Sequence, residues 1–409
     1  MANKQHQRPA VYLLATLDTK GPEAVLVRDR LVELGVEVVV VDTGCIGDPT
    51  FPGDVTREEV FAAAGSSLKE MLAKHDRGVA VTKAAAGATL VVRTTFKLGN
   101  LAGVFALGGS AGTTIGTAAM RSLPIGIPKV MVSTLASGDV RQWVGDKDIV
   151  MLNSVVDIAG INRISRQILL NAAAAMAGMV QHRAADAHED KPLVAATMFG
   201  VTTPCVQRAR EVLEEAGYEV LVFHATGNGG QAMESLIREG VIAGVLDITT
   251  TELADDLVGG VLSAGPSRLT AAAAAGVPQV VSVGATDMVN FWAPHTIPAE
   301  FKGRKFHKHN ATVTLMRTTA AENAMLGQEI GHKVSGSLGA AAIMLPLKGV
   351  SAIDREGESF DDPDARKALF DAIRSSHGGV ELVERDEHIN DHTFAEAAAE
   401  KLIQLMREP

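Results

Sequence analysis

Short apolar runs alternate with longer segments of helical periodicity through the first half of the chain. Each run is rich in aliphatic or β-branched residues and ends in Gly, Ser, Thr or Asp, as buried parallel strands do. The runs are "AVYLLAT" (10–16), "EVVVVDTG" (37–44), "LAGVFALGG" (101–109) and "PKVMVST" (128–134). Between them, segments such as 22–34 and 56–74 repeat apolar positions every three or four residues, which predicts helices. This alternation is typical of a parallel sheet covered by helices.

The second half repeats the same order, which predicts an internal pseudo-duplication. Its apolar runs are "PLVAATMFG" (192–200), "YEVLVFHATG" (218–227), "IAGVLDITT" (242–250) and "PQVVSVGATD" (278–287). The sequence therefore indicates an α/β protein of two Rossmann-like subdomains with mainly parallel sheets. The pairs that we expect to occupy equivalent places are Ala15 with Ala196, Asp42 with His224, Gly103 with Gly244, and Pro128 with Pro278.

A polar stretch, "QHRAADAHEDK" (181–191), separates the halves after an expected long helix over residues 158–179. We therefore expect an N-terminal subdomain over 1–188 and a C-terminal subdomain over 189–409. The first copy carries an insertion, residues 43–93, expected to lie over the strand ends. The tail adds strands at 341–351 and 379–386, a helix over 361–376 capped by Asp362 with Pro363 in its first position, and a terminal helix over 392–406.

Composition and charge narrow the classes of partner. The 409 residues carry a formal charge of −10 at pH 7, which argues against nucleic acid or an anionic membrane as a partner. No apolar run reaches the roughly 20 residues that span a bilayer, and the start lacks the apolar core of a signal peptide. The two cysteines, Cys45 and Cys205, are expected to be reduced thiols. These features favour the cytoplasm.

Asp18, Thr19 and Lys20 directly follow the strand at residues 10–16. In open parallel α/β sheets, ligands bind outside the carboxyl ends of the strands, because helix amino termini and turn amides converge there. A lysine and a hydroxyl beside a helix start can hold a phosphate, with Asp18 orienting the lysine or reaching a metal ion. The alternative is an ordinary strand-to-helix turn in which Asp18 or Thr19 caps the helix.

The strand at residues 101–109 runs into a glycine-rich turn that precedes an expected helix. Glycines let the backbone approach an anion closely, and consecutive amides with hydroxyl side chains can surround a phosphate. The spacing matches no standard nucleotide signature, so the pattern indicates an anion-binding loop or, alternatively, a plain turn. The residues concerned are Gly108, Gly109, Ser110, Gly112, Thr113 and Thr114.

The same turn also matches the G-x-S-x-G pattern of a serine nucleophile elbow through Gly108, Ser110 and Gly112. An elbow serine requires an acid and a histidine from later in the chain, such as Asp287 and His295. A serine hydrolase built on Ser110 is therefore an alternative function.

Other polar segments also fall at predicted strand ends. Residues 133–139 and 153–162 could line a site in the first half, and residues 224–234 offer amides at Asn228 and Gly229 in the second. The carboxylates Asp247, Glu252 and Asp287 could hold Mg²⁺ or act as acid and base. For each of these residues singly, helix capping or a surface charge is the competing interpretation.

Seven motifs in order carry a resemblance that spans nearly the whole chain. They are "ATLDTKG", "LGGSAGT", "STLASGD", "FHATGNGGQAME", "DITTTELAD", "GATDMVNFW" and "HNATVTLMRTT". The chain resembles the bacterial proteins related to the amino-terminal, ATP-binding domain of the tomato mosaic virus resistance protein. This resemblance implies two Rossmann-like subdomains, association as a homodimer, and binding of ATP with Mg²⁺. The matching positions are Asp18, Thr19, Lys20, Gly108 to Thr114, Ser137, Gly138, Asp139, Asn228, Gly229, Thr250 and Glu252.

The resemblance implies a role for each part of the first-half site. Lys20 would neutralise phosphate charge, the glycine-loop amides would hold phosphate oxygens, and Asp18 would be near the metal ion. Arg93, at the end of the insertion, could add a bidentate phosphate contact. We expect an ATP-binding protein that uses ATP on a small metabolite. The alternatives are a non-catalytic nucleotide or metabolite sensor and the serine hydrolase.

Overall fold

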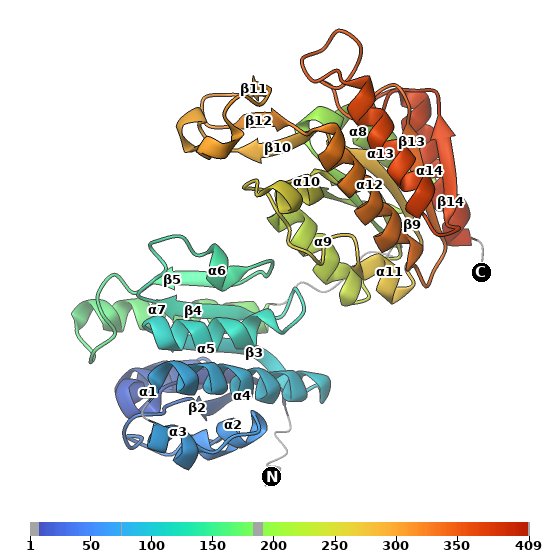
Figure 1. The fold of residues 1–409 in the computed structure, drawn as a ribbon. Coiled ribbons are helices and arrows are strands. Elements are labelled where there is room, and N and C mark those ends of the chain that lie inside the picture. Colours follow the sequence, from blue (N-terminus) through green and yellow to red (C-terminus); the bar gives the residue numbers. More distant parts are fainter. Residues whose placement is uncertain (1–7, 75, 183–190, 408–409) are drawn as a thin grey trace. The chain divides into compact units, whose positions relative to one another are not determined.

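The computed structural model describes residues 8–74, 76–182 and 191–407. The chain divides into two compact units, residues 1–187 and 188–409 (Figure 1). The predicted boundary, between residues 188 and 189, lies outside the described residues. Each unit contains its own parallel sheet with helices on both faces. The predicted α/β fold with two Rossmann-like subdomains is thereby confirmed.

The first unit is built on a five-stranded parallel sheet in the order β2-β1-β3-β4-β5. Its strands are β1 (Ala10–Ala15), β2 (Val38–Asp42), β3 (Leu101–Gly108), β4 (Lys129–Ser133) and β5 (Val150–Asn153). Side chains alternate between the two faces of β1, so Leu13 packs with α1 and α7 while Tyr12 and Leu14 pack on the opposite side. Both faces are covered, which explains why the strands read as continuous apolar runs.

Helices cover the two faces of this sheet unequally. α1 and α7 pack on one face, and α2 to α5 pack on the other. The helices are α1 (Leu17–Glu33), α2 (Arg57–Ala63), α3 (Leu68–Lys74), α4 (Arg77–Lys97), α5 (Ser110–Arg121), α6 (Arg141–Val144) and α7 (Arg163–Gln181).

Two predicted helices of the first unit are shorter than expected. The segment 56–74 forms two helices, α2 and α3, instead of one. The helix expected from residue 158 begins at Arg163, because Asn162 caps it by accepting hydrogen bonds from the amides of Ile164 and Ser165. Ile158 therefore packs against the core from outside the helix.

The second unit has a six-stranded parallel sheet in the order β14-β13-β9-β8-β6-β7 and a separate antiparallel sheet in the order β10-β12-β11. The strands of the large sheet are β6 (Leu193–Met198), β7 (Glu219–His224), β8 (Gly244–Thr249), β9 (Gln279–Gly284), β13 (Ala341–Pro346) and β14 (Glu381–Arg385). Those of the small sheet are β10 (Met288–Phe291), β11 (Phe306–Lys308) and β12 (Thr314–Arg317).

In this unit α8 and α14 cover one face of the large sheet, and α9 to α13 lie on the other. The predicted start of α13 is confirmed, since Asp362 accepts a hydrogen bond from the amide of Ala365 and Pro363 is the first helical residue. The helices are α8 (Thr203–Glu215), α9 (Asn228–Arg238), α10 (Thr251–Val258), α11 (Ala271–Ala275), α12 (Ala320–Ser335), α13 (Pro363–Ser376) and α14 (His392–Arg407), with short 3₁₀ turns η1 (Gly200–Thr202), η2 (Pro294–Thr296) and η3 (Ala299–Phe301).

The pairing registers of the two sheets show the internal duplication directly. Gly103 and Gly244 lie at the same register against β1 and β6, respectively. The carbonyls of Pro128 and Pro278 each accept a hydrogen bond of 2.9 Å from the amide that follows that glycine. Both predicted pairs are therefore equivalent in space.

One predicted pair is displaced by two residues. Asp42 pairs with Ala15 in the first unit and His224 pairs with Met198 in the second, so Asp42 and His224 are equivalent as predicted. The counterpart of Ala15 is therefore Met198 and not Ala196. A shift of two residues keeps every side chain on the same face of a strand, so the apolar pattern alone could not detect it.

In the part of the chain that the structure describes, no helix is both long enough and apolar enough to cross a membrane.

Candidate functional site

A pocket of about 220 Å³ opens in the first unit beside the carboxyl ends of β1 and β3. The chain runs outward from β1 to β2 in one direction and from β3 to β4 in the other, so β1 and β3 flank the point where the strand order reverses. Ligands of open α/β sheets bind at this switch point. The pocket is lined by Thr16, Asp18, Lys20, Thr43, Cys45, Ile46, Arg77, Val81, Gly108, Gly109, Ser110, Ala111, Gly112, Ile115 and Asp157.

The amino terminus of α5 forms one wall of this pocket. The helix begins after Gly109, which has no side chain with which to cap it, and the first amide to bond within the helix is that of Thr113, to the Gly109 carbonyl. The preceding amides, those of Ser110 to Gly112, belong to residues that line the pocket. Free amides at a helix start combine with the helix dipole to attract an anion.

The glycines of this turn serve two different purposes. Gly108 has φ +155°, and a Cβ there would lie 2.9 Å from the Cα of Gly112. A Cβ on Gly112 would lie 2.8 Å from the carbonyl oxygen of Leu107. These two glycines therefore allow α5 to begin directly against β3. A Cβ on Gly109 would approach only Thr134 Oγ1, at 3.7 Å, so Gly109 leaves the space in front of the helix open.

Two cationic side chains line the same pocket. Lys20 is half-buried, and its backbone angles of φ −126° and ψ 20° interrupt α1 at its first turn. Arg77 is the exposed first residue of α4. Arg77 was not expected from the sequence, whereas the predicted Arg93 is exposed on the same helix and does not line the pocket. Sixteen helical residues separate the two arginines, which corresponds to roughly 24 Å along the helix axis.

The carboxylate of Asp18 fixes the loop that follows β2. Its Oδ2 accepts hydrogen bonds from the amides of Cys45, Ile46 and Gly47 at 3.1, 2.9 and 3.3 Å. The loop passes so close that a Cβ on Gly44 would lie 2.8 Å from the Asp18 Cγ. The other oxygen, Oδ1, is shielded from solvent and has no hydrogen-bond partner among the described residues. Oδ1 is therefore the Asp18 oxygen that could bind a metal ion without losing a hydrogen bond.

The donor set suits a magnesium ion that a ligand helps to hold, and not a site made by the protein alone. Among the described residues, no group of three or more His, Cys, Asp or Glu side chains could hold a metal ion. Mg²⁺ is commonly bound by one or two carboxylates together with phosphate oxygens and water. Asp18 fits that pattern only if a phosphate is present beside it.

Burial affects two further titratable groups near the pocket. Asp42 accepts hydrogen bonds from the amides of Leu17 and Gly44, yet its burial, with Asp18 nearby, raises the pKa of its carboxyl group. Burial and the charge of Asp18 also raise the pKa of the Cys45 thiol. The thiol is therefore protonated at neutral pH and is poorly suited to act as a nucleophile.

The three threonines predicted as site residues in the first unit do not line the pocket. Thr113 is buried beneath it, where its hydroxyl donates to the Gly109 carbonyl and lies 2.7 Å from Ser133 Oγ. Thr114 donates to the carbonyl of Ser110, one turn back along α5. Thr19 is exposed, and its hydroxyl lies 2.8 Å from that of Thr16.

The predicted loop after β4 also lies outside the pocket lining. Ser137, Gly138 and Asp139 are exposed, and Asp139 pairs with Arg141 at 2.6 Å. The hydrogen bonds from Arg141 lower the pKa of Asp139 to about 2. Asp157, which was noted in the sequence only as a possible lining residue, does line the pocket.

In the second unit, a carboxylate of the protein occupies the start of a helix, α9. Glu252 Oε1 accepts hydrogen bonds from the amides of Gly227 at 2.7 Å and Gly230 at 3.1 Å, at the start of α9. The first helical residue, Asn228, is exposed, and a Cβ on Gly229 would lie 1.9 Å from the His224 carbonyl oxygen. This glycine therefore serves close packing.

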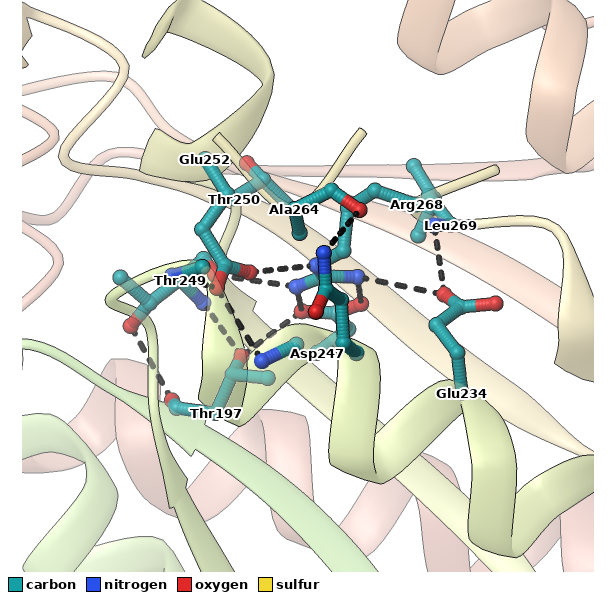
Figure 2. Close-up of polar contacts among 12 residues, drawn as sticks. Thr197, Glu234, Asp247, Thr249, Thr250, Glu252, Ala264, Arg268 and Leu269 are labelled. Carbon is teal, nitrogen blue, oxygen red and sulfur yellow. Dashed lines mark hydrogen bonds and ion pairs between the residues drawn. The ribbon is translucent and has the colours of Figure 1, made fainter. Parts of the chain in front are cut away.

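Glu252 is held by a fully buried arginine, Arg268, as Figure 2 shows. Arg268 Nε donates to Glu252 Oε2 at 2.6 Å, and its terminal nitrogens contact the two carboxylate oxygens of Asp247 at 2.5 and 2.7 Å. Glu234 lies 3.6 Å from Arg268 and accepts hydrogen bonds from the amides of Leu269, Thr270 and Ala271, the last of which is the first residue of α11. The predicted site residues Asp247 and Glu252, and the neighbouring Glu234, are therefore all paired with Arg268 inside the protein.

The strand ends of the second sheet are closed by hydroxyl groups. The Oγ1 atoms of Thr202 and Thr249 lie 2.8 Å apart. Thr249 also donates to the Thr197 carbonyl (Figure 2). The predicted ligand residue Thr250 is buried and donates to the carbonyl of Ser282. The switch point that is open between β1 and β3 is therefore filled between β6 and β8.

The serine nucleophile elbow finds little support in the geometry. Ser110 is exposed in the pocket, but it is an ordinary first residue of α5 and not one of the non-glycine residues with positive φ in the described chain. An elbow serine sits on a strained turn. The described residues that line the pocket include no histidine. Asp287 and His295 belong to the second unit, where Asp287 is fully buried and bonded to Ser351.

Two family models match the chain, one to each unit. Residues 9–185 match the N-terminal domain of the Uncharacterised protein family (UPF0261), and residues 191–406 match its C-terminal domain. A UPF0261 protein of Clostridium tetani is 52% identical over 97% of this chain and 99% of its own length. Another from Rhizobium meliloti is 47% identical over 95% of this chain and 97% of its own length.

A plant protein is also similar. The ToMV resistance protein Tm-1(GCR237) of Solanum lycopersicum is 41% identical over 99% of this chain but only 57% of its own length. Among solved structures, the glycosyltransferase SnogD from Streptomyces nogalater matches over 98% of this chain and 100% of its own chain, at 12% identity. The TM-score is 0.20, which supports no argument about fold or function. The chain belongs to the UPF0261 family.

Proposed function

We propose that this member of the UPF0261 family binds ATP with Mg²⁺, and that the phosphates lie in the pocket at the carboxyl ends of β1 and β3. The observation that carries the proposal is the uncapped start of α5, which shares its pocket with Lys20 and Arg77. Backbone amides, a helix dipole and two cations at a switch point are together suited to a phosphate chain.

The charge balance of the pocket favours a metal–phosphate complex over a bare anion. Asp18 and Asp157 line the pocket together with the two cations. A bare anion would be repelled by both carboxylates, whereas a divalent ion held by Asp18 would neutralise that carboxylate and attract the phosphates. Asp18 Oδ1 lacks a partner among the described residues, so it can take this role without breaking the hydrogen bonds made by Oδ2.

ATP is the nucleotide that the family resemblance indicates, and the bound triphosphate suggests group transfer to a small metabolite. In this proposal the exposed carboxylate of Asp157 is the group positioned to accept a proton from a co-substrate at the pocket mouth. The proposal includes a cytoplasmic homodimer. A sensor would bind ATP in the same pocket without turning it over.

Calorimetric titration with ATP in the presence of Mg²⁺ tests the proposal, using the wild type, Lys20→Ala and Lys97→Ala. Lys97 is exposed in the last turn of α4 and controls for the loss of a positive charge. We expect saturable binding by the wild type and Lys97→Ala, and binding at least about tenfold weaker by Lys20→Ala, because a hydrogen bond to a charged group contributes about 1.5–3 kcal/mol. A wild type that does not bind ATP overturns the proposal, as does full affinity in Lys20→Ala.

A further inference from the structure

A second hollow adjoins the phosphate pocket. It has a volume of about 340 Å³ and lies between the loop after β2 and the helices α3 and α4. Three residues line both hollows, namely Cys45, Ile46 and Arg77. The two hollows are therefore neighbours that share these three residues as walls.

The chemistry of the two hollows is different. The phosphate pocket contains the amides of α5 and four charged side chains. The second hollow is walled mainly by apolar side chains, those of Ile46, Met71, Leu72 and Ala80, with Asp76 and Arg77 as its two charged residues. Met71 and Ala80 are buried and form its floor, while Ile46 and Leu72 are exposed at 61% and 38% and form its rim. A polar, charged compartment thus adjoins an apolar one.

The volumes of the two hollows suit a ligand with two parts, one in each hollow. Small-molecule sites usually have volumes of about 300–1,000 Å³, and the phosphate pocket alone is below this range. The phosphate pocket is large enough for a phosphate chain but small for a whole nucleotide. The adjoining hollow supplies the additional volume and the apolar walls that a planar base requires.

We propose that the hollow between the β2 loop and α3–α4 is the nucleobase subsite of the nucleotide whose phosphates lie at α5. This inference rests on the proposed function, because it takes the phosphate pocket as the triphosphate site. Ile46 and Leu72 cover the base from the rim, Met71 and Ala80 contact it from the floor, and Arg77 stands at the junction between base and phosphates.

The position of the rim residue Ile46 links the subsite to Asp18. The amide of Ile46 donates to Asp18 Oδ2 at 2.9 Å, so the carboxylate that would hold the metal ion also positions the rim of the base subsite. Binding of the phosphates and binding of the base therefore depend on one loop. A ligand with both parts is expected to bind more tightly than inorganic tripolyphosphate, which has only one.

The test compares ATP and inorganic tripolyphosphate, each with Mg²⁺, in calorimetric titrations of the wild type and Leu72→Asn. Leu72 lines only the second hollow and is exposed, so its replacement leaves the fold and the phosphate pocket unchanged. The matched control is Leu98→Asn, because Leu98 is 67% exposed at the end of α4 and lines neither hollow. Both substitutions are neutral, so neither changes the charge that the phosphates meet.

We expect Leu72→Asn to weaken ATP binding by about tenfold, in line with the loss of apolar burial, and to leave tripolyphosphate binding unchanged. Leu98→Asn should bind both ligands as the wild type does. If ATP binds Leu72→Asn as tightly as the wild type, the nucleobase subsite is wrong while the proposed function stands. If the wild type binds neither ligand, the proposed function fails and the subsite with it.

Discussion

Glu252 Oε1 accepts a hydrogen bond of 2.7 Å from the backbone amide of Gly227, at the start of α9. The carboxylate occupies the place that a ligand's phosphate would take at a helix terminus. No side chain does the same for α5 in the first unit, where Gly109 precedes the helix. α9 follows β7, the counterpart of β2, whereas α5 follows β3, so the two helices are not equivalent in the duplication. Of these two helix starts, the one at α5 has no side-chain cap and lies in a pocket.

Arg77 and Arg93 provide a matched pair on one helix. Arg77 lines the pocket, whereas Arg93 is exposed outside it. We predict that Arg77→Ala raises the dissociation constant for Mg²⁺–ATP by about tenfold or more, as the loss of a charge-assisted contact implies. Arg93→Ala should bind like the wild type. Equal losses in both variants, measured by calorimetry, would show that general surface charge and not the pocket holds the phosphates.

Gly109 and Gly112 should respond differently to replacement by alanine. A Cβ on Gly112 would lie 2.8 Å from the Leu107 carbonyl oxygen, so Gly112→Ala should lower the midpoint of denaturation. A Cβ on Gly109 meets no atom closer than 3.7 Å, so Gly109→Ala should fold normally while crowding the anion in front of α5. Denaturation curves and ATP titrations of the two variants check this. Normal ATP affinity in Gly109→Ala would argue against phosphate binding at this terminus.

Asp18→Asn should separate the structural role of Asp18 from its role beside the metal. Asparagine keeps one oxygen to accept the amides of the β2 loop, now bonded to Oδ2, but it presents a neutral side chain to the ion. We predict a folded variant in which Mg²⁺ no longer strengthens ATP binding. Titrations with and without Mg²⁺ give the measurement. An undiminished Mg²⁺ effect would exclude Asp18 as a ligand.

The buried Arg268 should be essential to the second unit. Arg268→Met would leave Asp247 and Glu252 buried without their cation, which typically costs about 3–5 kcal/mol of stability. Arg238→Met is the control, because Arg238 is exposed and its ion pair with Glu234 is long, at 3.9 Å. Urea denaturation of both variants should show a large loss for the first and little for the second. A small loss for Arg268→Met would contradict the network in Figure 2.

The raised pKa of the buried Asp255 carboxyl group should make the stability of the second unit depend on pH. Burial raises the pKa of Asp255 from about 3.8 to about 7 in the folded protein, against the hydrogen bonds from Asn290. Between these values the folded state holds a proton that the unfolded state has lost, so stability falls as pH rises, by up to about 1.4 kcal/mol per pH unit. Relative to Asp255→Asn, the wild type should lose stability from pH 4 to pH 7. A constant difference between the two, measured by denaturation, would refute the assignment.

Patterns local in the sequence predicted most of the fold. The apolar runs located the parallel strands, and Asp362 with Pro363 located the start of α13, because strand burial and helix capping depend on neighbouring residues. The glycine turn at Gly109 and the adjacent Lys20 were likewise recognisable as parts of a strand-end pocket.

Contacts between distant segments could not be predicted in the same way. Glu252 looked like a ligand residue until the structure showed Arg268 beside it, sixteen positions later in the chain. The sequence indicates Arg93, whereas Arg77 lines the pocket, because the pattern of α4 does not show which end of the helix meets the strand ends. Thr113 faces the core because of its place in the turn of α5, which depends on where the helix begins.

Hydrogen–deuterium exchange of the whole chain, with and without Mg²⁺–ATP, tests the central claim most directly. The account predicts protection of the amides at the starts of α1 and α5 and in the loop after β2, with no change at the start of α9, where Glu252 already holds the amides. Protection at α9 without protection at α5, or no protection anywhere, would contradict it.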